Sequence, residues 1–255
     1  MLQIIVHVWG DMYGDEYIDK LRRSIDKHTT VPWNLKVLRD QENGWSEYSK
    51  KWFRGEGDPR VVQGDGWVNG YHNYNLGGLP LYKKMYPWMM DQHCSDDDVI
   101  MYLDIDMVIN GDLKYFTELD LSKPWVQWDY DLHEDYIYRN PGNQNSTPIN
   151  TSVVVYKKGQ MRPITNLVTR MPDQVFCSYR RVDAYVWYEF GVKDFFNYLP
   201  ADAVDWHYKD TNPVIRNLAG EDMKRKDAAI IKDVPSLPTP VPKQQSWIKR
   251  LFKWV

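Results

Sequence analysis

The run VIMYL at residues 99–103, followed at once by Asp104 and Asp106, constrains the fold of this chain most strongly. Five consecutive apolar residues are typical of a strand that is buried on both faces, as parallel strands in α/β domains are. The chain has 255 residues and is 43% hydrophobic, which is enough for one large domain with a full core. We therefore expect an α/β fold whose strongest strand covers residues 99–109.

The rest of the pattern fits an alternation of strands and helices. Further strands are predicted at residues 3–9, 34–40, 124–131, 150–159 and 228–234. Helices are predicted at residues 15–28, with Asp15 as the N-terminal cap, and at 79–90, 160–171 and 183–191. The first strand, helix and strand form the usual opening unit of a doubly wound sheet.

Two segments are expected to lie outside the regular elements. Residues 41–79 are rich in glycine and polar residues, which predicts a long loop. A proline-rich stretch then leads into SWIKRLFKWV at residues 246–255, which has the pattern of a short basic amphipathic helix. We therefore predict a single domain over residues 1–234 and a linker with a tail helix over residues 235–255.

Charge and cysteine content narrow the possible partners and compartments. The net charge of −3 gives no general attraction to nucleic acid. Cys94 and Cys177 have no close spacing, which favours free thiols, and the N-terminus does not resemble a signal peptide. We expect a cytoplasmic protein. Its basic tail has the features of a peripheral membrane contact, although packing on its own domain or on a neighbouring subunit is the alternative.

The pair Asp104 and Asp106 is informative because of its position. The chain has 27 aspartates and three D-x-D triplets, so the triplet alone means little. This triplet, however, directly follows the apolar strand, and in open α/β sheets ligands bind outside the carboxyl ends of strands. Carboxylate oxygens suit Mg²⁺ or Mn²⁺, which would in turn hold a diphosphate. Turn or capping chemistry at a strand end is the alternative.

The segment YLDIDMVINGDLKYF resembles the metal-binding segment of GT-A fold glycosyltransferases of the glycogenin and bacterial galactosyltransferase type. The resemblance implies a Rossmann-like mixed sheet flanked by helices and a nucleotide-sugar donor, with a UDP-sugar favoured. It implies that Asp104 contacts the ribose and the metal, that Asp106 binds the metal, and that Leu103 lines the nucleotide site. The cofactor would be Mn²⁺ or Mg²⁺.

Three further stretches resemble the same family in the same order along the chain. VHVWGDMYGDEYIDKLRRSI resembles its first strand, turn and helix, and GLPLYKKMY resembles a segment that carries a lysine before D-x-D. INTSVVVYKKG resembles the strand that faces the sugar. The resemblance places Trp9, Gly10 and Tyr13 near the nucleotide base. It assigns Lys84 to the segment before D-x-D, and it places Asn150 and Ser152 beside the sugar.

Asp183, in RRVDAYVWYEF, lies where the family has an Asp-Gln helix start near the reacting centre. Ala184 replaces the glutamine, so helix capping is an equal interpretation of Asp183. The family also has a histidine as third metal ligand after its last strand, with a lysine beyond it that contacts phosphate. Here Asp233 falls near the histidine position, and His207 is another candidate ligand. The phosphate lysine is missing, with Lys232 or residues 224–226 as possible substitutes.

These features predict a metal-dependent hexosyltransferase that moves a sugar to an acceptor hydroxyl on a carbohydrate, glycolipid or protein. Asp129, Asp131 and Asp183 are candidates for a base if the reaction inverts configuration. The resemblance leans toward retention. A catalytically inactive protein that binds carbohydrate or nucleotide sugar on the same scaffold is the alternative. A nucleotidyltransferase is disfavoured, since the turn after the first strand, WGDMYGDEY, lacks a basic phosphate loop.

Overall fold

The computed structural model describes residues 1–8, 13–39, 84–128, 147–171, 174–175, 178–179, 181–206 and 212–218. All of them belong to one compact unit, Met1–Glu221. The predicted loop at 41–79, the strand at 228–234, the linker, the tail helix and the domain boundary after residue 234 lie outside the described residues. These features remain predictions.

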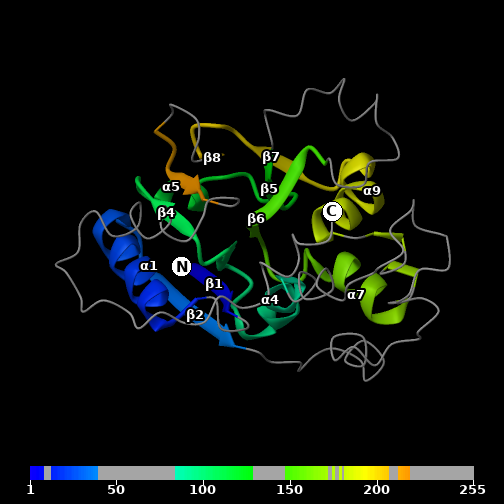
Figure 1. The fold of residues 1–255 in the computed structure, drawn as a ribbon, viewed down its shortest axis with the longest axis horizontal. Coiled ribbons are helices and arrows are strands. Elements are labelled where there is room, and N and C mark those ends of the chain that lie inside the picture. Colours follow the sequence, from blue (N-terminus) through cyan, green and yellow to red (C-terminus); the bar gives the residue numbers. More distant parts are fainter. Residues whose placement is uncertain are drawn as a thin grey trace, which may run out of the picture. The chain divides into compact units, whose positions relative to one another are not determined.

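A six-stranded mixed sheet forms the centre of the fold, with the strand order β2-β1-β3-β6-β5-β7. Figure 1 labels β1, β2, β5, β6 and β7 of this sheet. Its strands are β1 (Leu2–Val8), β2 (Trp33–Arg39), β3 (Val99–Leu103), β5 (Trp125–Trp128), β6 (Ile149–Tyr156) and β7 (Asn197–Leu199). β1 runs parallel to β2 and β3, whereas β6 runs antiparallel to β3 and β5. All five residues of β3 are buried, as the apolar run predicts.

A second, three-stranded sheet has the order β4-β9-β8, formed by β4 (Met107–Ile109), β9 (Ile215–Asn217) and β8 (Val204–Trp206). The prediction of one strand over residues 99–109 is therefore wrong, because β3 and β4 belong to different sheets. The chain turns at Ile105 and Asp106 and leaves the ladder of β3. Both aspartates of the D-x-D triplet thus lie at the passage from one sheet to the other.

Among the described residues, the helices with defined bounds are α1 (Asp15–His28), α4 (Tyr86–Met89), α5 (Lys114–Thr117), α7 (Arg162–Arg170) and α9 (Val182–Glu189), with 3-10 turns at Met90–His93 and Gly191–Lys193. α1, α7 and α9 confirm the predicted helices within two residues at each end. Of the predicted helix at 79–90, residues 79–83 lie outside the described residues. The described part contains α4, with Pro87 in its first turn, where a missing N–H is tolerated. None of the described helices is long and apolar enough to cross a membrane.

The N-terminus of α1 differs from the prediction. Gly14 is the capping residue and Asp15 is the first residue of the helix. The Asp15 carboxylate instead pairs with Arg39 at the end of β2. Tyr17, Leu21 and Ile25 are buried on one face of α1, as their spacing predicts.

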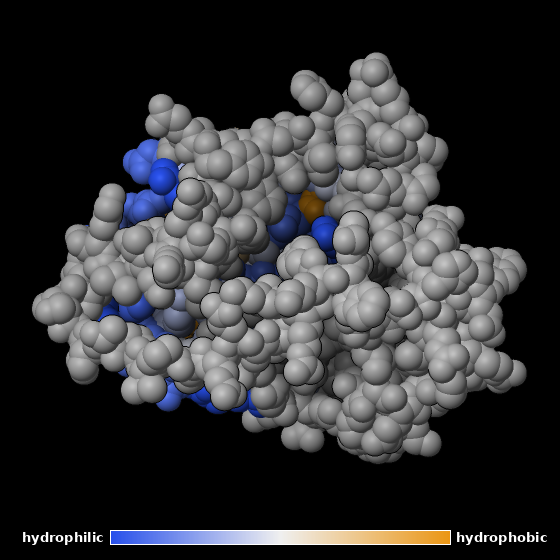
Figure 2. Space-filling model, in the orientation of Figure 1, coloured by the Kyte–Doolittle hydropathy of each residue, from blue (hydrophilic) through white to orange (hydrophobic). Residues whose placement is uncertain are grey.

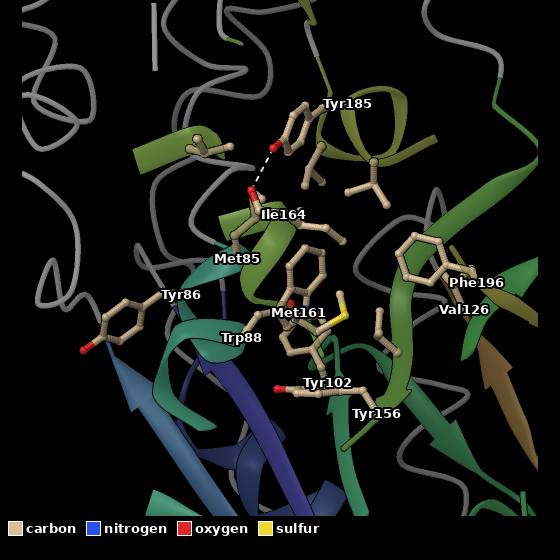
Figure 3. Packing of buried hydrophobic residues seen from close by; sticks show 14 of the residues in the cluster. Met85, Tyr86, Trp88, Tyr102, Val126, Tyr156, Met161, Ile164, Tyr185 and Phe196 are labelled. Carbon is tan, nitrogen blue, oxygen red and sulfur yellow. Dashed lines mark hydrogen bonds between the residues drawn. The ribbon is translucent and has the colours of Figure 1, made fainter. Parts of the chain in front are cut away.

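A large hydrophobic core cluster, which contains several aromatic side chains, lies between the central sheet and helices α4, α7 and α9 (Figure 3). Trp88 of α4 meets Tyr102 of β3 edge-on, with 6.3 Å between ring centroids. The Tyr185 hydroxyl of α9 donates to the Ile164 carbonyl oxygen of α7 at 2.7 Å, which ties the two helices together (Figure 3). At the surface, most of the described residues visible in Figure 2 are hydrophilic. The apolar side chains therefore pack around the sheet, whereas the end of β3 carries polar groups.

Candidate active site at the carboxyl end of β3

The site is built around Asp104, the first residue after β3. Its backbone N–H donates to the Ser152 carbonyl oxygen at 2.9 Å and so extends the pairing of β3 with β6 by one residue. This fixes the backbone from which the carboxylate projects. Leu103, immediately before it, is completely buried at the end of the strand; its contact with a nucleotide remains a prediction.

Three donors hold the Asp104 carboxylate. Lys84 Nζ lies 2.7 Å from Oδ2, and the Ser152 hydroxyl donates to the same oxygen at 2.7 Å. The Tyr102 hydroxyl donates to Oδ1 at 2.5 Å. The Lys84 side chain is only 9% exposed and that of Asp104 19%, so this is a largely desolvated ion pair. Lys84 and Ser152 therefore meet at Asp104, although they are far apart in sequence.

Asp106 is buried as well, with 7% of its surface exposed. Its Oδ2 accepts a hydrogen bond from the Tyr13 hydroxyl at 3.1 Å, and Tyr13 packs edge-on against Tyr17 of α1 with 4.9 Å between centroids. Tyr13, which precedes α1, thereby reaches the second aspartate of the triplet. Its contact with a nucleotide base is untested.

Asp183 is the third carboxylate of the site. It is the second residue of α9, whose capping residue is Arg181, so Asp183 does not cap the helix. Instead its Oδ1 accepts hydrogen bonds from Thr151, at 2.8 Å from the backbone N–H and 2.5 Å from the hydroxyl. The helix start is thus attached to β6 beside Ser152.

An irregularity in β6 brings these groups together. Val126 of β5 is paired with Val154, but the next residue, Gln127, is paired with Asn150, so Thr151–Val153 have no partner on β5. We call this segment the β6 bulge. It carries the donors to Asp183 and Asp104, and the Asn150 side-chain oxygen accepts the Ser152 backbone N–H at 2.8 Å. Bulges redirect side chains in this way next to active sites.

Burial and charge shift the ionisation of the site in a consistent direction. Burial raises the pKa of Asp104, since Lys84 only partly offsets the loss of water and Asp106 adds to the increase. Burial alone would lower the pKa of Lys84, but Asp104, Asp183 and Asp106 together raise it. The lysine therefore stays protonated. Within the described part of the chain, three carboxylates surround one ammonium group and leave an excess of two negative charges.

The two tyrosines also stay protonated. Burial and the charge of Asp104 raise the pKa of Tyr102 well above its usual value. Burial and the charge of Asp106 do the same for Tyr13. Each hydroxyl therefore acts as a hydrogen-bond donor to its carboxylate.

The acidic excess fits a divalent cation. Two carboxylates, with water and phosphate oxygens completing the shell, are the usual protein share of a Mg²⁺ site. Among the described residues, no group of three or more His, Cys, Asp or Glu side chains is placed to hold a metal ion. The predicted third ligands, Asp233 and His207, lie outside the described residues, and so do Trp9 and Gly10. The same holds for other candidates, namely Asp129, Asp131, Lys232 and residues 224–226.

Tyr102 and Thr151 have site contacts that the sequence interpretation missed. Tyr102 counts there only as part of an apolar run, although a buried tyrosine hydroxyl usually needs a partner. Because Asp104 lies two residues further along the chain, it could have been predicted from the sequence as the partner of the Tyr102 hydroxyl. Thr151 carries no comparable signal, because its partner Asp183 is 32 residues further along the chain.

Solved structures share this fold at low sequence identity. The apo structure of the bifunctional glycosyltransferase WbbM matches 92% of this chain with a TM-score of 0.53 and 13% identity, over 50% of its own length. The galactosyltransferase LgtC in complex with donor and acceptor sugar analogues matches 86% of this chain and 87% of its own, with a TM-score of 0.52 and 14% identity. An active-site mutant of LgtC gives a TM-score of 0.53.

The fold is therefore that of GT-A-type glycosyltransferases, as the resemblance predicts. The chain spans about half the length of WbbM. No protein-family model and no curated protein matches the sequence. At these identities the likeness concerns the fold, and the chemistry has to be argued from the residues of the site.

Proposed function

We propose that this chain is a glycosyltransferase that moves a sugar from a nucleotide-diphosphate sugar, with a UDP-sugar favoured, to an acceptor hydroxyl. The observation that carries the proposal is the cluster of Asp104, Asp106 and Asp183 around the buried Lys84, at the carboxyl end of the central strand. The GT-A-type fold supports it, because structures with this fold include a galactosyltransferase with donor and acceptor sugar analogues.

In this proposal Asp104 and Asp106 hold Mn²⁺ or Mg²⁺. A divalent cation bound there would neutralise the two excess charges and stabilise the negative charge of the leaving diphosphate. The chain's own residues prepare the ligands. Tyr102, Ser152 and Lys84 fix the orientation of Asp104, taking three of about four acceptor positions of a carboxylate within the described contacts.

Asn150, Ser152 and Asp183 take the roles next to the transferred sugar. Within the described residues, both hydrogen bonds of Asp183 fall on Oδ1 and come from Thr151, which leaves Oδ2 for a substrate hydroxyl. If the reaction inverts configuration, Asp183 is the base within the described residues. The acceptor is proposed to be a carbohydrate, glycolipid or protein hydroxyl, and the basic tail is proposed to reach a membrane surface.

The proposal is tested by nucleoside diphosphate release from a panel of UDP- and GDP-sugars with Mn²⁺. Wild type is compared with Asp106→Asn, and Asp120→Asn serves as the matched control because Asp120 lies in an exposed turn. Release from one donor should stop with EDTA and fall at least about 100-fold in Asp106→Asn, since electrostatic stabilisation is the largest catalytic contribution. The control should retain wild-type release.

Two other outcomes decide against an enzyme. Mn²⁺-dependent binding of a nucleotide sugar without any release would indicate the inactive binding protein. A folded protein with neither release nor binding would refute the metal role of the aspartates.

A further inference from the structure

A buried amide beside the site is incompletely paired. Gln127 of β5 is 0% exposed. Its side-chain oxygen accepts a hydrogen bond from Asn217 Nδ2 of β9 at 2.9 Å. Its Nε2, in contrast, has no hydrogen-bond partner within the described part of the chain. Buried polar groups without partners are rare because they lose their bonds to water, so an exception calls for an explanation.

The position of Gln127 connects it with the proposed active site. Gln127 is paired with Asn150, the residue at which β5 and β6 resume their register beyond the β6 bulge. Its partner Asn217 is paired with Met107, the residue directly after Asp106. The hydrogen bond between Gln127 and Asn217 therefore links the six-stranded sheet to the three-stranded sheet. One end of this link is paired with Asn150, and the other end is paired with the residue after Asp106.

The anchored oxygen fixes the direction of the amide. Because Asn217 donates to Oε1, the NH₂ group of Gln127 must occupy the other branch of the planar amide. This group offers hydrogen atoms and accepts nothing, so its partner must be an oxygen or another acceptor. A sugar presents several hydroxyl oxygens that meet this requirement.

The Trp88 and Tyr156 side chains also carry a buried donor atom without a partner among the described residues, but their settings differ from that of Gln127. Trp88 Nε1 and the Tyr156 hydroxyl belong to large aromatic side chains inside the core cluster. Burial of their rings accounts for their position. A glutamine has little apolar surface to bury and is seldom fully buried, so packing gives Gln127 no similar reason.

We propose that Gln127 is a sugar-binding residue whose Nε2 donates a hydrogen bond to one hydroxyl oxygen of the transferred sugar. The inference rests on the proposed function and adds a determinant of donor specificity to it. A site built to bond a hydroxyl discriminates against the analogue that lacks it, because its own polar group is then left unpaired. Gln127 should therefore affect recognition of the sugar and leave recognition of the nucleotide unchanged.

The test removes the Gln127 side-chain amide and single sugar hydroxyls, separately and together, and compares the effects. The panel donor from which wild type releases UDP is compared with its analogues that each lack a single hydroxyl. Wild type should prefer the full donor over one analogue by at least about tenfold in kcat/KM, which corresponds to one hydrogen bond. In Gln127→Met this preference should disappear for that analogue, while the Kd of UDP with Mn²⁺ stays the same.

Two further variants separate binding from structure. Gln3→Met makes the same chemical change on β1, where Gln3 donates to Asp98, and should keep the preference. Asn217→Ala leaves Gln127 in place but removes the donor that orients its amide. It should reduce the same preference, and it serves as the test if Gln127→Met does not fold.

The failures are distinguishable. Wild-type release with an unchanged preference in Gln127→Met and Asn217→Ala would overturn the inference alone. An equal loss of affinity for UDP and for the UDP-sugar would also overturn it, because Gln127 would then act only on the structure. A wild type that neither binds nor cleaves any donor would overturn the proposed function and the inference with it.

Discussion

Replacing Tyr102 by phenylalanine removes one hydroxyl from the site and leaves the ring in place. This hydroxyl donates to Asp104 Oδ1 at 2.5 Å, and the edge-on contact of the ring with Trp88 does not involve it. Hydrogen bonds to charged groups contribute about 1.5–3 kcal/mol. If the bond supports the active geometry in full, its loss lowers kcat/KM by about 10- to 150-fold.

The same variant should change the pH dependence of activity. The Tyr102 hydrogen bond favours the ionised form of Asp104 and so opposes the increase that burial causes in its pKa. Without the bond, the pKa of Asp104 rises further. Because the proposed metal ligand has to be ionised, the acidic limb of the pH profile should move to higher pH.

The assay is UDP release measured from acidic to neutral pH, with Tyr156→Phe as the matched control. Tyr156 is a buried tyrosine of β6, and its hydroxyl has no partner among the described residues. The control should keep the wild-type pH profile. If Tyr102→Phe is folded and its rate and acidic limb both equal those of wild type, Tyr102 does not position Asp104.

Three further substitutions test the surroundings of the site. Lys84→Met leaves largely buried carboxylates without their ammonium partner and should lower the free energy of unfolding in urea by about 3–5 kcal/mol. This destabilisation should be smaller at acidic pH, because the carboxyls are then protonated. Thr151→Val removes the hydroxyl bond to Asp183 but keeps the backbone bond; kcat should fall about tenfold or more and recover in Thr151→Ser, and an unchanged kcat would refute this role. Gly191→Ala would place a Cβ 2.4 Å from Trp187 Cε3, so the ring must move. The free energy of unfolding should fall by about 1–3 kcal/mol, and an unchanged Tm would contradict this close contact between Gly191 and Trp187.

The sequence predicts those parts of the fold that depend on local patterns. The apolar run 99–103 is a buried strand, and the spacing of Tyr17, Leu21 and Ile25 defines one face of α1. Both signals arise within one element, from the periodicity of strands and helices. Asp104 and Asp106 could be singled out because a strand end is a local feature as well.

The second sheet and the β6 bulge were not predictable in the same way. β4, β8 and β9 have three residues each, and β4 pairs with β9 across about a hundred positions of sequence. Such short strands carry no periodicity, and their pairing depends on the fold as a whole. The bulge in β6 arises from a register shift against β5, which no local pattern encodes.

The contacts that complete the site are long-range as well. Tyr13 reaches Asp106 across 93 positions of sequence, and Gln127 reaches Asn217 across 90. The family resemblance predicts that Lys84 and Ser152 belong to the site, but it does not predict that both bind the same oxygen of Asp104. Side-chain partners of this kind follow from the passage between the two sheets and become visible only in three dimensions.

The central claim is that the acidic cluster at the end of β3 binds a divalent cation together with a nucleoside diphosphate. The most direct measurement is a titration of Mn²⁺ into the protein with UDP, following the electron paramagnetic resonance signal of free Mn²⁺. Wild type should remove Mn²⁺ from solution at one ion per chain, and Asp106→Asn should weaken this binding by more than about tenfold, since even indirect changes at metal sites cost that much. Equal binding by wild type and Asp106→Asn, or none by either folded protein, would contradict the account.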